Sequence, residues 1–195
     1  MSVERFDVRR IAPQPWKNRA GMTREIARGG GGMRADDAFA WRLSLAEIER
    51  DAPFSTYAGV DRCIVLLRGA GMRLRSHDGR IDHALTEPLA PFDFPGEAAL
   101  DATLVAGACS DFNVMTRRGV FRSSVGVQRH AAELPGADIT LLLCSAGEWR
   151  VGTQTLGPLQ ALLWRASPAS IAVRPALDGL PAALLFVRLC HDRGA

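Results

Sequence analysis

The apolar residues of this chain come in short runs, and this pattern constrains the fold more than any other feature of the sequence. Each run is three to seven residues long and is bounded by glycine, proline, aspartate or serine. Such runs are typical of strands, and the 11 prolines and 19 glycines spread along the chain leave little room for long helices. We therefore predict an all-β fold. The predicted strands lie within residues 39–45, 63–67, 100–105, 112–115, 139–144, 159–164, 171–173 and 184–190.

A faint internal repeat divides the predicted strands into two sets. Residues 65–71 align with residues 141–147 at a shift of 76 residues, and each segment is an apolar strand followed by a turn of small residues. Pro88-Leu89 matches Pro158-Leu159 at a shift of 70, which requires a second hairpin six residues shorter than the first. A chain of 195 residues is long enough for two small barrels. We expect one barrel over residues 1–105 and one over residues 106–195, with exchange of strands between the halves left open.

The charged residues argue against a nucleic-acid partner. The 24 basic and 21 acidic residues give a net charge of +3, and every basic residue except Lys17 is an arginine. These arginines are scattered, whereas a nucleic-acid-binding domain concentrates its positive charge on one element. No helix-turn-helix pattern is visible, and no apolar run approaches the roughly 18 residues that a membrane helix needs. We expect a cytoplasmic protein without a direct nucleic-acid or membrane partner.

The cysteines and histidines do not follow a metal-site pattern. The four cysteines lie in or beside apolar segments and include no C-x-x-C pair, so we expect buried reduced thiols. The four histidines include no His-x-His pair, so we expect no bound metal and no cofactor. These residues are Cys63, Cys109, Cys144, Cys190, His77, His83, His130 and His191.

Four consecutive glycines at residues 29–32 form the stretch with the fewest side chains to pack. The surrounding segment, residues 28–37, lacks the spacing of a phosphate-binding loop. We predict a mobile connection between two strands.

Two of the predicted strands carry a polar face. Side chains alternate along a strand, so Arg42 and Ser44 share one face while the apolar residues 41, 43 and 45 share the other. By the same alternation, Asp111 and Asn113 share a face with residues 115 and 117. A barrel lined in this way encloses a polar pocket, and its candidate aromatic walls are Trp16, Trp41 and Phe54.

Four arginines are flanked by apolar residues, which is costly unless each charge is paired or solvated in a cavity. One interpretation is an internal salt bridge, for instance to Glu25, Asp61 or Asp111. The other is a guanidinium that grips a ligand carboxylate with two hydrogen bonds. We favour Arg62 for this second role because it follows a turn and opens an apolar strand. The four residues are Arg24, Arg42, Arg62 and Arg117.

Three segments of the sequence carry a recognisable set of motifs. Residues 15–26 read PWKNRAGMTREI, residues 41–48 read WRLSLAEI and are followed by PFS at 53–55 and GVDR at 59–62, and residues 111–119 read DFNVMTRRG. Together these segments resemble the HutD/Ves family. Family members show Pro-Trp-x-Asn, a glycine cluster and Thr-x-Glu-Ile in the first segment. Arg19 and Ala20 interrupt that cluster and leave only Gly21, which puts a close approach of ligand to backbone in doubt at this place.

The resemblance implies a bicupin fold and an accessory or regulatory role in histidine utilisation. It also implies that the polar pocket binds a small anionic metabolite, either urocanate or a formyl- or formimino-glutamate-like intermediate, all of which carry a carboxylate. Together with the polar faces, it gives these expected ligand-binding residues: Asn18, Thr23, Arg24, Glu25, Trp41, Arg42, Ser44, Phe54, Ser55, Arg62, Asp111, Asn113, Met115 and Arg117.

A second hypothesis is a metal-independent isomerase or hydrolase that acts on a small carboxylate and uses Glu25 or Asp111 as a general base. A carboxylate beside an arginine normally has a lowered pKa and is a poor base near neutrality, so we favour a binding protein. Ser44 and Ser55 lack an adjacent base, so we do not expect a serine nucleophile. Whether the protein forms a homodimer is left open.

Overall fold

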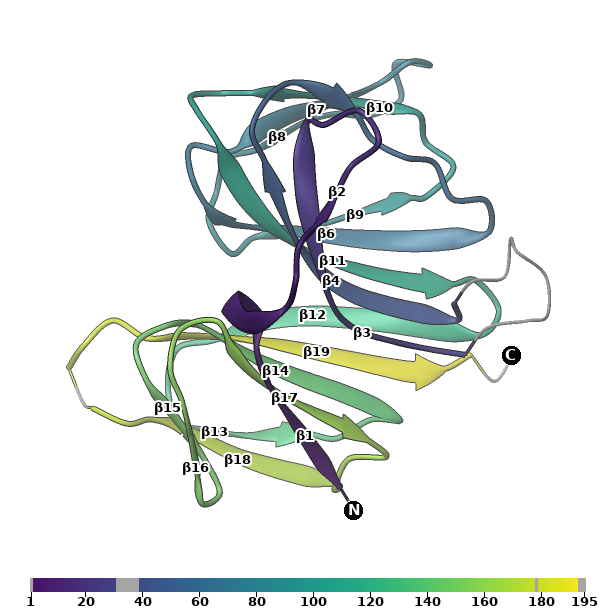
Figure 1. The fold of residues 1–195 in the computed structure, drawn as a ribbon. Helices are drawn as coiled ribbons and strands as arrows, with labels where there is room; N and C mark the ends of the chain where they lie inside the picture. Colours follow the sequence, from purple (N-terminus) through teal and green to yellow (C-terminus); the bar gives the residue numbers. More distant parts are fainter. Residues whose placement is uncertain (1, 31–38, 178, 193–195) are drawn as a thin grey trace. The chain divides into compact units, whose positions relative to one another are not determined.

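The computed structural model describes residues 2–30, 39–177 and 179–192. Within these residues the elements are strands, apart from one short 3-10 helix, η1 (Val8–Arg10) (Figure 1). The prediction of an all-β fold is therefore confirmed. Gly29 ends strand β3 (Gly21–Gly29), whereas the rest of the predicted glycine-rich connection, from residue 31 to residue 37, lies outside the described residues.

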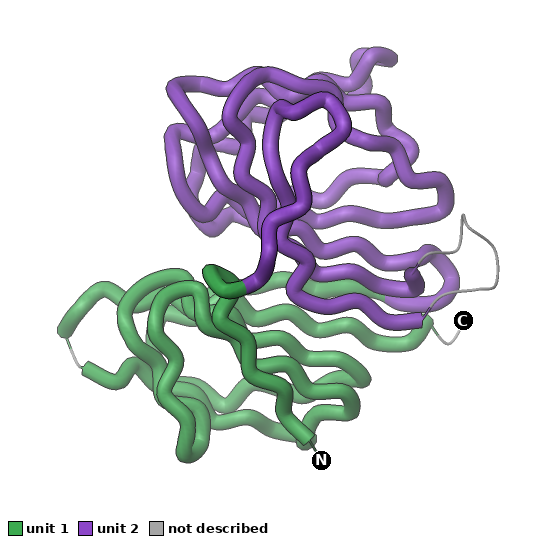
Figure 2. Tube along the Cα trace, in the orientation of Figure 1, with its two compact units in different colours: residues 1–10, 122–195 green, residues 11–121 purple. Residues whose placement is uncertain are grey.

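The chain forms two compact units, which Figure 2 shows in two colours. Unit 2 is continuous and spans residues 11–121, whereas unit 1 combines residues 1–10 with residues 122–195. Residues 1–10 belong to unit 1 because β1 (Val3–Asp7) pairs antiparallel with β17 (Gln160–Arg165). The boundary expected between residues 105 and 106 falls inside unit 2, in the turn between β10 (Leu100–Leu104) and β11 (Cys109–Arg117).

Unit 2 contains two sheets (Figure 1). Both contribute side chains to one apolar core, which includes Ile64, Leu74 and Leu100. The larger sheet has six strands in the order β2 (Gln14–Pro15), β3, β4 (Trp41–Ile48), β11, β6 (Val60–Arg68) and β9 (Pro91–Pro95). The smaller has four in the order β5 (Ala52–Pro53), β10, β7 (Met72–Ser76) and β8 (Asp82–Leu85).

Unit 1 is also built from a larger and a smaller sheet. Its apolar core lies between them and includes Leu142, Trp149 and Ile171. The larger sheet has the order β1, β17, β14 (Ile139–Ala146), β19 (Ala183–His191) and β12 (Phe121–Gln128). The smaller has the order β13 (Ala132–Pro135), β18 (Ser170–Pro175), β15 (Trp149–Val151) and β16 (Gln154–Leu156).

The two units repeat one strand order. The series β4-β11-β6-β9 in unit 2 corresponds to β12-β19-β14-β17 in unit 1, and β5-β10-β7-β8 corresponds to β13-β18-β15-β16. The two halves of the sequence repeat lie where β6 turns into β7 and where β14 turns into β15. The hairpin at residues 149–156 is six residues shorter than the one at residues 72–85. The sequence repeat therefore coincides with a structural repeat.

The match between the units extends to an unusual backbone conformation. Leu89 and Leu159 both have positive φ angles, of 68° and 61°, which non-glycine residues seldom adopt. The backbone N–H of Leu89 donates to the carbonyl of Leu66 at 2.9 Å, and that of Leu159 donates to the carbonyl of Cys144 at 2.8 Å. Each leucine thus precedes the strand that pairs with β6 or with β14.

The prediction of two closed barrels is wrong. The described backbone hydrogen bonds do not join the larger to the smaller sheet in either unit, so all four sheets are open and have two edge strands each. Each unit is therefore a sandwich whose core is supplied by two sheets.

The cysteines match their expected chemistry. Cys63, Cys109 and Cys144 are buried, Cys190 is partly buried, and all four are free thiols. Burial raises the pKa of Cys109 to about 11 and that of Cys144 to about 12, so both stay protonated near neutrality.

Among the described residues, no helix is long and apolar enough to cross a membrane.

Candidate functional site

Unit 2 contains a cavity of about 620 Å³, a size typical of small-molecule sites. Its walls come from the larger sheet of the unit, from β2 with the segment that follows it (residues 14–18), and from the end of β5 with the segment that follows it (residues 53–57). Ten of the 14 residues predicted from the sequence line this cavity. They are Asn18, Thr23, Arg42, Ser44, Phe54, Ser55, Arg62, Asp111, Asn113 and Met115.

Strand β11 gathers the polar residues of the cavity because β4 and β6 pair with it on its two sides. Asn113 lies opposite Ser44 on β4, and Met115 lies opposite both Arg42 on β4 and Arg62 on β6. The alternation of side chains along β4 and β11 therefore turns these residues to the same side of the sheet, as the sequence pattern predicts.

Arg62, Asn113 and Asp111 form a chain of hydrogen bonds in the cavity wall. Arg62 Nη2 donates to Asn113 Oδ1 at 2.8 Å, and Asn113 Nδ2 donates to Asp111 Oδ1. Arg62 Nη1 also donates to the backbone carbonyl of Ser55 at 3.2 Å. Among the described residues, Arg62 Nε and Asp111 Oδ2 are buried without a hydrogen-bond partner.

Aromatic rings surround the Arg62 guanidinium. Its central carbon lies 4.9 Å from the ring centre of Phe94, 5.3 Å from that of Phe54 and 5.7 Å from that of Tyr57. These distances allow cation–π attraction. Burial lowers the pKa of Arg62 to about 10, and the charge of Asp111 opposes that change. Arg62 therefore remains a cation at neutral pH.

Asp111 departs from the expectation for a carboxylate near an arginine. Its side chain is 0% exposed, and this burial raises its pKa to about 7, while the charge of Arg62 acts in the opposite direction. Desolvation outweighs the attraction because no hydrogen bond joins the two groups directly and Asn113 lies between them. The expected lowering of a carboxylate pKa beside an arginine is therefore wrong for Asp111.

Two other arginines are paired with carboxylates. Arg42 Nε contacts Glu25 Oε2 at 2.8 Å, and Arg24 Nη1 contacts Glu47 Oε1 at 2.8 Å. Arg42 still lines the cavity, whereas Arg24 and Glu25 do not. For Arg24 and Arg42 the structure thus contains the internal salt bridges that the sequence left open as an alternative.

Trp41 and Arg117 also lie outside the cavity lining. Trp41 is only 2% exposed and belongs to the opposite face of β4, where its ring packs over Gly29. Arg117 ends β11, and its Nε donates to the backbone carbonyl of Phe39 at 3.4 Å. The structure therefore places these two predicted ligand-binding residues outside the cavity lining.

The segment Gln14 to Asn18 supplies one wall of the cavity, and it contains lining residues that sequence reasoning missed. Trp16 Nε1 donates to Thr23 Oγ1 at 2.8 Å, and the Trp16 ring meets the Phe54 ring edge to face with centres 6.2 Å apart. Trp16 was predicted as a candidate aromatic wall, whereas no sequence signal marks the cavity position of Lys17, the only lysine. The lining residues beyond the predicted set are Gln14, Pro15, Trp16, Lys17, Ala46, Pro53 and Tyr57.

The interrupted glycine cluster forms a tight turn at the end of this segment. Arg19 has a positive φ of 55°, and its N–H donates to the carbonyl of Trp16 at 3.0 Å. A Cβ on Gly21 would lie 2.3 Å from the backbone oxygen of Glu47 on β4. Strand packing therefore requires a glycine at position 21, and the positive φ of Arg19 is a conformation that glycine adopts without steric cost, so the glycine cluster has a structural role.

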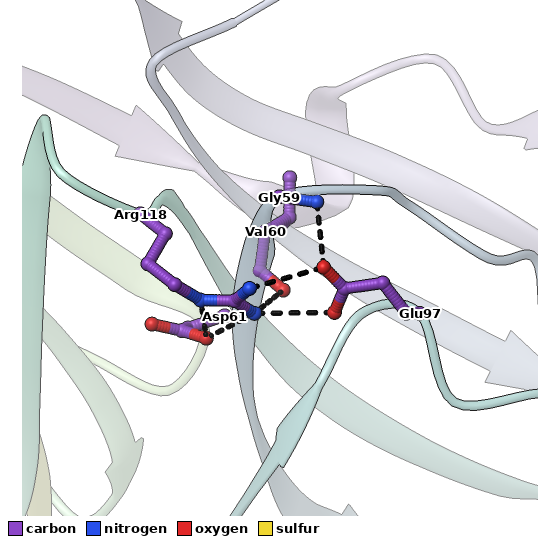
Figure 3. A network of polar contacts seen from close by, with 5 residues as sticks. All are labelled: Gly59, Val60, Asp61, Glu97 and Arg118. Carbon is purple, nitrogen blue, oxygen red and sulfur yellow. Dashed lines mark hydrogen bonds and ion pairs between the residues drawn. The ribbon is translucent and has the colours of Figure 1, made fainter.

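Asp61, another candidate salt-bridge partner, lies in a network outside the cavity lining (Figure 3). Arg118 Nη2 contacts Asp61 Oδ1 at 2.8 Å, and Arg118 Nη1 contacts Glu97 Oε1 at 3.1 Å. Glu97 also accepts the backbone N–H of Gly59 at 2.7 Å. The hydrogen bonds from Arg118 lower the pKa of Glu97 to about 2. This network connects turns of unit 2, and the contacts described for it do not include Arg42 or Arg62.

The described residues contain no cluster of three or more histidine, cysteine, aspartate or glutamate side chains that could hold a metal ion. His83 stacks on Phe92 with ring centres 3.7 Å apart, His77 contacts Asp101 at 3.0 Å, and none of the residues lining the cavity is a histidine. The polar groups of the cavity are suited to hydrogen bonding and to charge recognition.

Comparison with known proteins gives a consistent picture. The family model described as HutD matches residues 9–179. HutD from Pseudomonas fluorescens SBW25, in a formate condition, is 28% identical with a TM-score of 0.86, and the alignment covers 99% of this chain and 100% of that one. A conserved protein of unknown function from Pseudomonas aeruginosa PAO1 is 29% identical with a TM-score of 0.84, and the alignment covers 97% and 100%.

More distant structures share the fold alone. Oxalate decarboxylase from Lactobacillus farciminis, in a formate complex, is 7% identical with a TM-score of 0.62, and the alignment covers 94% of this chain and 85% of that one. The fold is thus cupin-like.

Proposed function

This chain belongs to the HutD family, and we propose that its cavity binds a small carboxylate metabolite of histidine utilisation without a metal ion. Urocanate and a formyl- or formimino-glutamate-like intermediate are the ligands we favour, and the role we propose is accessory or regulatory. We also infer from the repeated strand order that the two units are the halves of a bicupin.

The observation that carries this proposal is the placement of Arg62. Arg62 is only 7% exposed and lines the cavity, and its Nη1 and Nη2 donate to the carbonyl of Ser55 and to Oδ1 of Asn113. A guanidinium uses parallel N–H groups to bind a carboxylate. Lys17 and Arg42 add positive charge to the same cavity, and Trp16 and Tyr57 offer apolar surface to the rest of a small ligand.

The test is titration calorimetry of the purified protein with urocanate, N-formylglutamate and formiminoglutamate. We expect Arg62→Ala to weaken binding by about 30-fold or more, which corresponds to about 2 kcal/mol. Arg75→Ala is the matched control, because Arg75 is exposed on β7 and pairs with Asp82 outside the cavity. Binding that survives Arg62→Ala unchanged, or no binding of any of the three compounds, would contradict the proposal.

A second candidate function is acid–base catalysis, and the raised pKa of Asp111 favours it. A carboxyl group that titrates at about 7 in a cavity can both give and accept a proton at neutral pH. The same three compounds, followed by NMR for conversion into product, test this alternative. Turnover by the wild-type protein that Asp111→Asn abolishes and Arg75→Ala retains would favour an enzyme over a binding protein.

A further inference from the structure

The Asn113 side chain connects Asp111 to Arg62 through two hydrogen bonds. The Asn113 side chain presents its oxygen to Arg62 and its amide nitrogen to Asp111. An amide has one oxygen and one NH₂ group, so a reversal of Asn113 would place donor against donor at Arg62. Asp111 therefore helps to hold the acceptor of Asn113 against the guanidinium. The three residues therefore form one continuous chain of hydrogen bonds, with Asn113 in the middle.

The hydrogen-bonded chain ends at Asp111, a buried carboxyl group in which one oxygen has no hydrogen-bond partner in the described part of the chain. Asp111 is 0% exposed, and its Oδ2 has no hydrogen-bond partner among the described residues. An ionised carboxylate here is poorly solvated and lowers the positive potential that Arg62 offers to the cavity. A ligand carboxylate beside Arg62 adds a second negative charge nearby, and because Asp111 is fully buried, this second charge favours protonation of Asp111.

We propose that Asp111 is a positioning residue that couples carboxylate binding at Arg62 to the uptake of one proton from the buffered solution. The proton is taken up by the Asp111 carboxylate, while the ligand remains an anion. The Asn113 amide keeps its orientation because either state of Asp111 leaves an oxygen to accept from Nδ2. This inference rests on the proposed binding of a carboxylate in the cavity.

Several other charged and titratable groups lie around Asp111 and the cavity. Arg62 faces it from β6, Arg42 lies on β4 with its partner Glu25 on β3, and Lys17 and Tyr57 come from the connecting segments. Cys109, on the same strand as Asp111, has a pKa that burial raises to about 11. Burial raises the pKa of Asp111 itself to about 7, so the coupling falls within an accessible pH range.

The experiment is calorimetric titration of the full-length protein with acetate and with N-formylglutamate at pH 6.0, 7.0, 8.0 and 8.5. Both probes stay fully ionised over this range. We expect the dissociation constant of the wild-type protein to rise about tenfold between pH 6 and pH 8. Repeating the titration in buffers with different ionisation enthalpies should show an uptake close to one proton at pH 8 and close to none at pH 6.

Asp111→Asn separates this coupling from a merely structural role. The variant cannot ionise at this position, so we expect an affinity independent of pH and about tenfold or more tighter than wild type at pH 8.5. Asp93→Asn, an exposed carboxylate on β9 outside the cavity lining, should keep the wild-type pH profile. If Asp111→Asn does not fold, the proton uptake measured for the wild-type protein still tests whether carboxylate binding is coupled to protonation.

The outcomes are distinguishable. Binding with the same affinity from pH 6 to pH 8.5 and no proton uptake would overturn the coupling while leaving the proposed function intact. Equal weakening of binding at every pH in Asp111→Asn would also overturn it, since that result indicates a structural role. No binding of either probe at any pH would overturn both the coupling and the proposed function.

Discussion

Single residues of the cavity are held in states that an isolated residue would avoid. Burial raises the pKa of Asp111 to about 7, so the folded protein favours its protonated form more than the unfolded chain does. The stability that this form contributes is present at acid pH and is lost as the pH rises from the ordinary carboxyl range to about 7. A group that costs stability at the pH where many proteins work is typical of a functional site.

Arg19 is a second residue in an unfavourable state, because its φ of 55° places a bulky side chain in the left-handed region. Glycine adopts this conformation without steric cost. We expect Arg19→Gly to raise the free energy of unfolding by about 0.5–1 kcal/mol in urea denaturation. Arg28→Gly on β3 is the control and should lower stability, since glycine weakens a strand. A loss of stability in Arg19→Gly would show that its side chain contributes more than the backbone strain costs.

At the scale of elements, the cavity depends on the close approach of β3 and β4. Gly21 pairs with Ile48 on β4, and a Cβ at Gly21 would meet the Glu47 backbone oxygen at 2.3 Å. Gly21→Ala must therefore push the two strands apart. We expect a loss of about 2 kcal/mol or more in the free energy of unfolding and weaker carboxylate binding, because Arg42 and Ser44 lie on the displaced strand.

The control for this prediction is Gly126→Ala on β12. A Cβ at Gly126 would have no atom within 4 Å outside its chain neighbours, so this change should alter stability by less than about 0.5 kcal/mol. Similar denaturation midpoints for the two variants would mean that β3 and β4 tolerate the added methyl group.

The same elements show what the sequence could and could not predict. The inward faces of β4 and β11 follow from alternation alone, so Arg42, Ser44 and Asn113 were found without a structure. In the wall from residue 14 to residue 18, Trp16 and Asn18 were predicted, whereas Gln14, Pro15 and Lys17 escaped prediction because β2 is only two residues long and has no periodicity to detect. Arg117 has the same alternation as Asp111 but ends its strand beyond the cavity, and the raised pKa of Asp111 depends on burial, which spacing does not reveal.

At the scale of the whole molecule, one strand plan supports two different interiors. Asp111 lies on β11, and the corresponding strand of unit 1 is β19, which reads ALLFVRLCH and has no aspartate or glutamate. The interior of unit 1 also contains Trp149, which is fully buried. The strand that corresponds to β11 therefore offers no carboxylate to the interior of unit 1. The repeat therefore predicts the strand arrangement of both units, but it does not predict which unit has a binding cavity.

Unit 1 depends on a strand from the other end of the chain. Beyond its ladder with β17, β1 adds hydrogen bonds from Arg5 to Thr155 and to Gln160, at 2.8 Å and 2.9 Å, and an ion pair from Glu4 to Arg165 at 2.9 Å. Deletion of residues 2–7 removes all of these contacts. We expect backbone amides of β17 to exchange with solvent about tenfold faster or more in hydrogen-exchange mass spectrometry, while β6 and β11 keep their wild-type rates. Equal acceleration in both units would contradict this prediction.

The pairing of β1 with β17 also sets an order of events during protein synthesis. Every residue of unit 2, including its cavity, is made before residues 160–164, and domains generally fold as units during synthesis. β1 therefore stays unpaired until β17 has been made. Its charged residues Glu4, Arg5 and Asp7 are favourable during this time, because charge on an unpaired edge strand discourages association with other chains.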